Sequence, residues 1–181
     1  MSRIAIPSLE ASPDASRPLL DAVTKQLGSA PNLFRLLGTS PAALEGYLGL
    51  SGALGKGSLD ARTRTRISML VAELNRCDYC LSAHTYLGKN LAKLDDAELT
   101  ANRDAASSDP KATAALRFAR AVVQERGRVS TAELEAVKAA GHTDAQVIEI
   151  VLHVALNTLT NYVNTVAATD IDFPVVAHRA P

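Results

Sequence analysis

The chain has two cysteines, Cys77 and Cys80, in one Cys-x-x-Cys unit, and His84 lies four residues after the second. Two thiols at this spacing can interconvert between a dithiol and a disulfide. If the segment is helical, Cys80 and His84 lie one turn apart on the same face. An imidazole there can accept the thiol proton, and the thiolate is the reactive form of cysteine. The residue types and their spacing therefore indicate thiol redox chemistry.

The sequence alone does not decide which of the two cysteines is the attacking nucleophile. A helix N-terminus carries about half a positive charge, which stabilises a thiolate and favours Cys77, the cysteine nearer the terminus. His84 favours Cys80 instead, because it follows Cys80 by one helical turn. Both assignments stay open at this point.

Metal binding is a second chemistry that these residues allow. Structural zinc sites normally have four protein ligands, whereas Cys77, Cys80 and His84 supply three. A distant histidine or carboxylate would have to complete the set. A third interpretation treats the cysteines as small buried hydrophobes. The helical placement and His84 favour redox chemistry, and we expect neither a bound metal nor a cofactor.

Helical spacing recurs along the chain, and strand patterns are almost absent. The clearest predicted helix runs from Leu59 to Leu74, with one apolar stripe. Its three arginines are expected to face water: Arg62, Arg64 and Arg66. Asn75 is predicted as a left-handed stop, so that a new helix starts at or just before Cys77. That arrangement places the cysteine pair on a first helical turn.

Helix-capping patterns mark further boundaries. They are Gly28, Asp109-Pro110, Ser130 with Glu133, Gly141, and Thr143 with Gln146. From Thr143 to about Thr169 the chain is apolar but interrupted by polar residues, as in a buried helix rather than a membrane span. The prediction is an all-α bundle of roughly seven to nine helices in a single domain, residues 1–181, with residues 1–12 as an extended arm.

A polar stripe interrupts the last predicted helix. Asn157, Asn161 and Asn164 share one helical face, and buried polar groups must be hydrogen-bonded. We interpret the stripe as interhelix hydrogen bonds; lining of the site or a subunit interface is the alternative. His153, one turn earlier, is interpreted as a core residue, with a second site histidine as the alternative.

The composition narrows the classes of binding partner that we expect for this chain. The formal net charge is zero, so nothing electrostatic predicts nucleic acid or an anionic membrane as a partner. The apolar run at residues 4–6 is cut short by Pro7, which argues against a signal peptide. We therefore expect a cytoplasmic protein, where a Cys-x-x-Cys unit is more often catalytic or metal-binding than structural.

Three stretches resemble the alkylhydroperoxidase D family of the carboxymuconolactone decarboxylase-like superfamily. The most specific is residues 61–84, which end in the Cys-x-x-Cys-x-x-x-His core. Residues 30–34 and the run 157–164, followed by Asp172-Phe173-Pro174, are similar to its peroxidase-related members. The resemblance thus spans nearly the whole chain.

This resemblance implies an all-helical trimer or hexamer that reduces organic hydroperoxides. By motif position, Cys80 is implied to attack the peroxide, Cys77 to resolve the sulfenic acid, and His84 to belong to the proton relay. The implied reductant is an external dithiol such as a dihydrolipoyl protein.

One position departs from the family pattern. Members commonly carry a glutamate twelve residues before the first cysteine, and this position is Thr65 here. A threonine hydroxyl does not act as a carboxylate base at neutral pH. Glu73 is the nearest carboxylate in sequence and is our candidate replacement; the alternative is that it is solvated or pairs with Arg76 or Arg66.

We therefore predict a thiol-dependent peroxidase, with Cys80, Cys77, His84 and Glu73 as candidate catalytic residues. The alternatives are a disulfide reductase or electron carrier, and a redox-sensing or metal-binding module. We do not expect decarboxylase activity, because that reaction would give the cysteine pair no clear chemical role.

Overall fold

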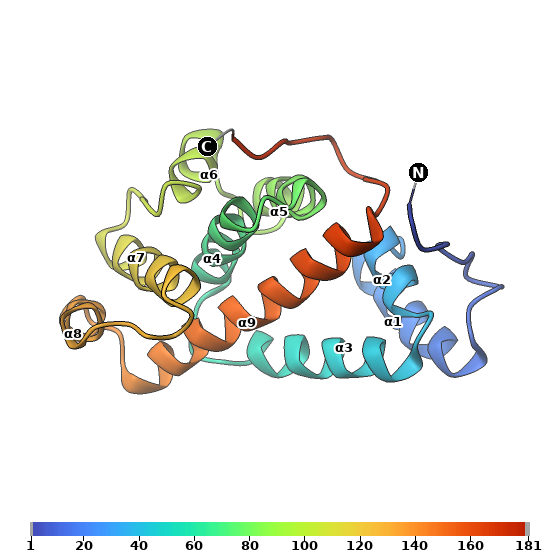
Figure 1. The fold of residues 1–181 in the computed structure, drawn as a ribbon, viewed down its shortest axis with the longest axis horizontal. Coiled ribbons are helices and arrows are strands. Elements are labelled where there is room, and N and C mark those ends of the chain that lie inside the picture. The colour runs from blue at the N-terminus through green and yellow to red at the C-terminus, as the bar shows by residue number, and fades with distance from the viewer. Residues whose placement is uncertain (1, 180–181) are drawn as a thin grey trace.

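The computed structural model describes residues 2–179, which fold into helices joined by loops and form no strands (Figure 1). In chain order these are a 3-10 turn η1 (Asp14–Ser16), α1 (Arg17–Leu27), α2 (Asn32–Leu37), α3 (Pro41–Gly55), α4 (Ala61–Leu74), α5 (Asp78–Asn90), α6 (Asp96–Asn102), α7 (Pro110–Gln124), α8 (Thr131–Ala139) and α9 (Asp144–Ala167). The all-α prediction is confirmed. Within this range no helix is both long and apolar enough to cross a bilayer. Residues 2–12 contain no helix, and residue 1 of the predicted arm lies outside the described residues.

Most of the predicted caps lie at observed helix boundaries. Complete capping boxes start α8 and α9, because each N-cap hydroxyl and the side chain three residues later exchange hydrogen bonds with the backbone. Gly28 ends α1 in the left-handed conformation, with φ of 83°. The prediction for Asn75 is wrong: the left-handed residue is Arg76, with φ of 53°. Asn75 instead turns its amide toward α9, where Nδ2 donates to Asn161 Oδ1 at 2.9 Å.

Helix α4 lies at the centre of the bundle and packs against α5, α6, α7 and α9. Ile67, Leu70 and Val71 face a core shared with α7 and α9. Met69 and Ala72 face a second core, which includes the cysteine pair. A helix packed on several sides keeps only a narrow face for polar residues.

This central position explains a wrong prediction about the arginines. Arg62 is exposed, but Arg64 is half-buried and Arg66 is buried. The Arg66 Nε donates to Oε1 of Glu98 at 2.8 Å, and that carboxylate is also buried. An arginine can lie in the interior here because a carboxylate from α6 neutralises it.

The segment after α9, residues 168–179, forms a C-terminal strap. It leaves the end of α9 and runs across α5 toward α6 (Figure 1, dark red). The backbone N–H of Val176 donates to Ser82 Oγ at 2.9 Å. His178 Nδ1 and its backbone N–H both lie 2.7 Å from Asp78 Oδ1, at the first turn of α5. The strap therefore covers the end of α5 that carries the cysteines.

Candidate active site

The cysteine pair lies where α4 gives way to α5. Arg76 turns the chain in a left-handed step, and the Cys77 N–H donates back to the Ala72 carbonyl at 3.0 Å. Cys77 has extended dihedral angles and is the N-cap of α5, its Sγ accepting from the Cys80 N–H at 3.3 Å. The pair thus occupies the first turn of a helix, as the sequence predicts, where the helix dipole favours negative charge.

Hydrogen bonds make the two thiols unequal. Both cysteines are reduced and about 3% exposed. A hydrogen bond from the Cys77 thiol lowers the pKa of Cys80, against the opposing effect of burial. The Nδ2 group of Asn164 donates to Cys80 Sγ at 3.3 Å and acts in the same direction. The pKa of Cys77 is raised by its bond to Cys80, by burial and by the Cys80 charge.

Asn161 adds to this stabilisation of Cys80. Its Oδ1 accepts from Asn75, while its buried Nδ2 has no other close partner in the described chain. That amide lowers the pKa of Cys80 as a further donor to the thiolate. The polar stripe of α9 therefore supplies both interhelix hydrogen bonds and contacts to a cysteine.

Cys80 opens onto a cavity of about 850 Å³ that Cys77 does not line. Helices α1 to α5, α9 and the strap enclose it. Most of its wall is apolar or aromatic, including Leu33, Phe34, Leu48, Leu87, Leu156 and Phe173. His84, Asn157 and His153 provide polar groups. The cavity can hold an apolar molecule with a reactive group at Cys80.

His84 lines the same cavity and is half-buried. Burial lowers its pKa to about 4, and the neighbouring Asn157 amide offsets this only in part. The imidazole is therefore neutral at pH 7 and able to accept a proton. Among the described residues no hydrogen bond joins His84 to either cysteine, but a molecule bound in the cavity that His84 and Cys80 both line can connect them.

Comparison with known proteins agrees with this geometry. Residues 41–121 match the carboxymuconolactone decarboxylase family. An alkylhydroperoxidase AhpD core, an uncharacterized peroxidase-related protein from Ralstonia eutropha JMP134, is 27% identical with a TM-score of 0.84, over 94% of this chain and 92% of that one. The chain has the alkylhydroperoxidase D-like fold of the carboxymuconolactone decarboxylase-like superfamily. No curated protein matches it.

Two further structures share this fold at lower identity. An uncharacterized peroxidase-related protein from Silicibacter sp. TM1040 is 22% identical with a TM-score of 0.81, over 93% of this chain and 91% of that one. A variant of the debrominase Bmp8 in complex with 2,3,4-tribromopyrrole is 18% identical with a TM-score of 0.74, over 88% and 86%. These two show the fold alone.

In this AhpD-like chain the structure does not bring Glu73 into the cavity. Its Oε2 accepts from Arg103 Nε at 2.6 Å, and its Oε1 accepts from the Arg179 N–H at 2.9 Å. Glu73 does pair with an arginine, but with Arg103 of the segment after α6 rather than Arg76 or Arg66. Its carboxylate holds the strap, which leaves the predicted relay role without a contact to support it.

Thr65 does line the cavity, at the position of the family glutamate. Its hydroxyl donates to the Ala61 carbonyl at 2.9 Å. The acidic residue that lines the cavity is Asp172, from the strap. Its Oδ2 accepts from the Asn32 N–H at 2.7 Å, and it also hydrogen-bonds Tyr79.

Sequence reasoning missed Asp172 as a cavity residue. The Asp-Phe-Pro stretch after the last helix contributes only to the resemblance, since nothing local indicates that the strap folds back over α5. The hydroxyl of Tyr79 accepts from the Leu33 N–H at 3.0 Å. Burial raises the pKa of Tyr79, so it stays protonated and ties α5 to α2 and the strap.

The other histidines have separate positions. His142 Nε2 lies 3.0 Å from the Lys111 carbonyl, and His178 is bound to Asp78. Across residues 2–179 no three His, Cys, Asp or Glu side chains are grouped as metal ligands would be. Within the described residues, the zinc interpretation therefore has no ligand cluster to support it, because Cys77, Cys80 and His84 do not form a group of three.

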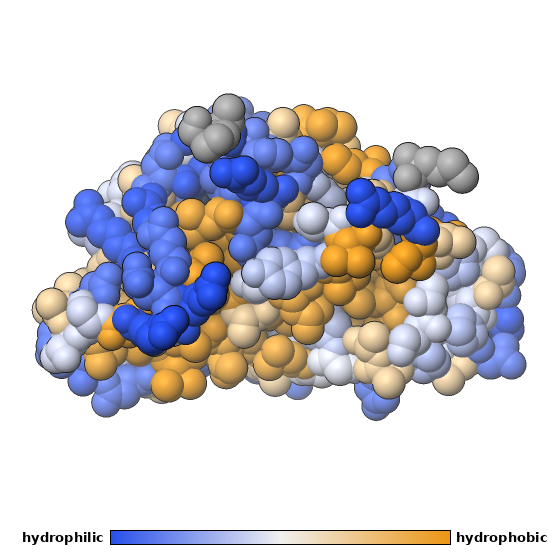
Figure 2. Space-filling view, viewed as in Figure 1, coloured by the Kyte–Doolittle hydropathy of each residue, from blue (hydrophilic) through white to orange (hydrophobic). Residues whose placement is uncertain are grey.

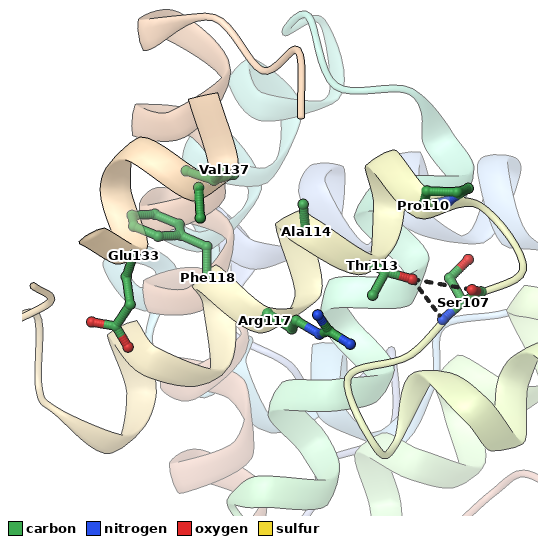
Figure 3. Close-up of a pocket in the computed structure, with 9 residues that line it drawn as sticks. Ser107, Pro110, Thr113, Ala114, Arg117, Phe118, Glu133 and Val137 are labelled. Atoms are coloured by element: carbon green, nitrogen blue, oxygen red, sulfur yellow. Dashed lines mark hydrogen bonds between the residues drawn. The ribbon is translucent and has the colours of Figure 1, made fainter. Parts of the chain in front are cut away.

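A second cavity, of about 590 Å³, lies between α7 and α8 (Figure 3). Phe118, Val137 and Arg117 contribute to its wall, but no cysteine or histidine does. Its one carboxylate, Glu133, accepts from Ser130 in the capping box of α8. The cysteine pair does not line this cavity, so it offers no thiol to a bound molecule.

Proposed function

We propose that this chain is a thiol-dependent peroxidase that reduces organic hydroperoxides through a Cys77/Cys80 dithiol–disulfide cycle. The observation that carries the proposal is the asymmetry of the pair. Cys80 lines the large apolar cavity and has the stabilised thiolate, whereas Cys77 lies behind it with its proton retained. The likeness to a peroxidase-related AhpD core supports the same conclusion.

In the first step the Cys80 thiolate attacks the terminal oxygen of the hydroperoxide. An S–O bond forms and the O–O bond breaks, leaving a sulfenic acid and an alkoxide that is protonated to the alcohol. Neutral His84 accepts the Cys80 proton by way of the bound peroxide and returns it to the alkoxide. The sulfur is oxidised by two electrons and the peroxide is reduced by two.

In the second step Cys77 attacks the sulfenic sulfur, the S–S bond forms, and water leaves. Oxidation of Cys80 removes the negative charge that raises the pKa of Cys77. Cys77 then sits as the N-cap of α5, where the dipole stabilises its thiolate. An external dithiol, such as a dihydrolipoyl protein, restores the pair by thiol–disulfide exchange.

We propose further that the chain assembles into a cytoplasmic homo-oligomer, a trimer or hexamer by resemblance. Large apolar side chains are exposed along one face of α9: Ile148, Leu152, Leu159, Tyr162 and Val166. Figure 2 shows apolar side chains gathered where α9 crosses this face of the molecule. Contiguous apolar surface of this kind is typical of protein interfaces.

The test is the oxidation rate of fully reduced, metal-free protein mixed with cumene hydroperoxide and followed by loss of free thiols. We expect both thiols to be lost much faster than those of free cysteine. Cys80→Ser should abolish the reaction, and Cys77→Ser should stop at a sulfenic acid that dimedone traps. Loss no faster than free cysteine would reject the peroxidase and favour a disulfide carrier or sensor.

A further inference from the structure

His153 lies on the cavity wall at a distance from the cysteines and has no assigned partner. It is about 5% exposed, and its Nε2 atom is buried without a hydrogen bond in the described chain. Buried polar atoms in native structures nearly always have a partner, so an orphaned nitrogen in a cavity wall indicates a ligand or water. Burial and then Arg64 lower the pKa of His153 to about 4, which leaves one N–H donor and one acceptor.

Arg64 places a positive charge beside His153, on the same cavity. Its Nη1 donates to the carbonyls of Gly55 and Leu59, at 3.1 Å and 2.8 Å. A guanidinium has five N–H donors, so others remain free for a ligand. The nearby Glu149 does not use them: its carboxylate accepts from the Ser58 and Leu59 backbone and from the Ser58 hydroxyl.

The spacing along α9 sets the length of the ligand. Asn164 donates to Cys80, and His153 lies eleven residues earlier on the same helix. At 1.5 Å per residue this separation is about 16 Å along the axis. The cavity wall is mostly apolar and includes Leu156 from α9 and Leu48 from α3, whereas Asn157 and Thr160 of α9 add polar groups to it.

We infer that the His153–Arg64 end of the cavity is a carboxylate-binding subsite for an elongated apolar ligand. The guanidinium and the imidazole N–H donate to the carboxylate oxygens, and the chain lies along the apolar wall toward Cys80. This inference rests on the proposed function for its substrate class, which is then a hydroperoxide carried by an alkyl or alkenyl chain with a terminal carboxylate.

The first test is independent of peroxide chemistry. Isothermal titration of the reduced full-length protein with laurate and with methyl laurate compares ligands that differ at the carboxyl end. We expect laurate to bind at least tenfold more tightly. His153→Leu should remove most of this preference, His153→Gln should retain part of it, and Arg62→Leu, an exposed arginine of α4, should leave it unchanged.

Equal affinity of the wild-type protein for laurate and for methyl laurate would overturn the inference. It would mean that the His153–Arg64 end of the cavity holds only water. Arg64→Leu provides a second variant if His153→Leu does not fold. The second test compares kcat/KM for linoleic acid hydroperoxide and its methyl ester, where we expect the same preference for the acid. If laurate binds tightly but no hydroperoxide oxidises the cysteine thiols, the carboxylate-binding subsite is supported and the proposed peroxidase function is rejected.

Discussion

Asn164 Nδ2 donates a hydrogen bond to Cys80 Sγ at 3.3 Å, although 84 residues separate them in the chain. Both groups are buried, so the bond acts in a low-dielectric interior where a donor to a thiolate has a large effect. The contact joins α9 to the first turn of α5. It lowers the pKa of Cys80 and so contributes to the difference in pKa between the two cysteines.

Asn164→Leu should raise the pKa of Cys80 and reduce its reactivity. A hydrogen bond to a charged group contributes about 1.5–3 kcal/mol, so alkylation by iodoacetamide at pH 7 should slow roughly tenfold or more. The pH dependence of alkylation should move to higher pH, since only the thiolate reacts. Asn90→Leu, at an exposed asparagine of α5, is the control. An unchanged alkylation profile would show that the Asn164 contact does not tune Cys80.

His84→Gln should slow oxidation by cumene hydroperoxide roughly 10²-fold, because glutamine keeps the polar contact but accepts no proton. The pKa of His84 is about 4, so its imidazole resonances should titrate near that pH and not near 6.5. An NMR titration of the wild-type protein and of His84→Gln assigns these resonances, because they are present in the first protein and missing from the second. Titration near 6.5 would contradict the lowered pKa of His84, to which its role as a neutral base at pH 7 is tied.

Glu73→Gln should change the oxidation rate of Cys80 less than about twofold, because the carboxylate binds Arg103 and the strap rather than the cysteine pair. The change should instead loosen residues 168–179. Faster amide hydrogen exchange in the strap, measured by mass spectrometry, is the expected signature. A several-fold loss of oxidation rate with an unaltered strap would restore Glu73 to the relay.

Arg66→Met should destabilise the protein by about 3–5 kcal/mol, because it leaves the buried Glu98 carboxylate without its cation. The matched control is Arg62→Met, on the exposed side of the same helix, where we expect a change within about 0.5 kcal/mol. Urea denaturation of both variants measures the difference. Similar midpoints for the two would mean that hydrogen bonds from the Ser107–Ser108 segment suffice to hold Glu98.

His153 should make stability depend on pH. Its folded pKa of about 4 lies below the ordinary value of 6.5, so the unfolded chain binds a proton more readily. The contribution of His153 to stability is therefore fully present above about pH 6.5 and is lost as the pH falls toward 4. Between pH 7 and pH 5 the loss from this group is about 2 kcal/mol. His153→Leu should lack that part of the loss in denaturation curves, whereas an identical pH dependence would indicate a solvated imidazole.

Local patterns in the sequence were sufficient for the longer helices and for the position of the cysteine pair, but not for the short helices α2 and α6. Apolar spacing and capping residues act within a few positions along the chain, which is why the capping boxes at Ser130 and Thr143 and the helix start at Cys77 were predicted. The left-handed turn was displaced by one residue, to Arg76, because Asn75 forms a contact with α9 that local patterns do not contain.

The partners of the site residues depend on how distant helices pack. No local signal links Asn164 to Cys80, Glu73 to Arg103 or Arg66 to Glu98, because these contacts form between elements tens of residues apart. The sequence by itself determined that a Cys-x-x-Cys pair starts a helix in an all-α chain. Only the tertiary structure decided that Cys80 lines the cavity, because distant helices and the strap form its walls. Beyond the hydrogen bond between the two cysteines, the amides of Asn164 and Asn161 on α9 lower the pKa of Cys80, and no local pattern predicts these contacts.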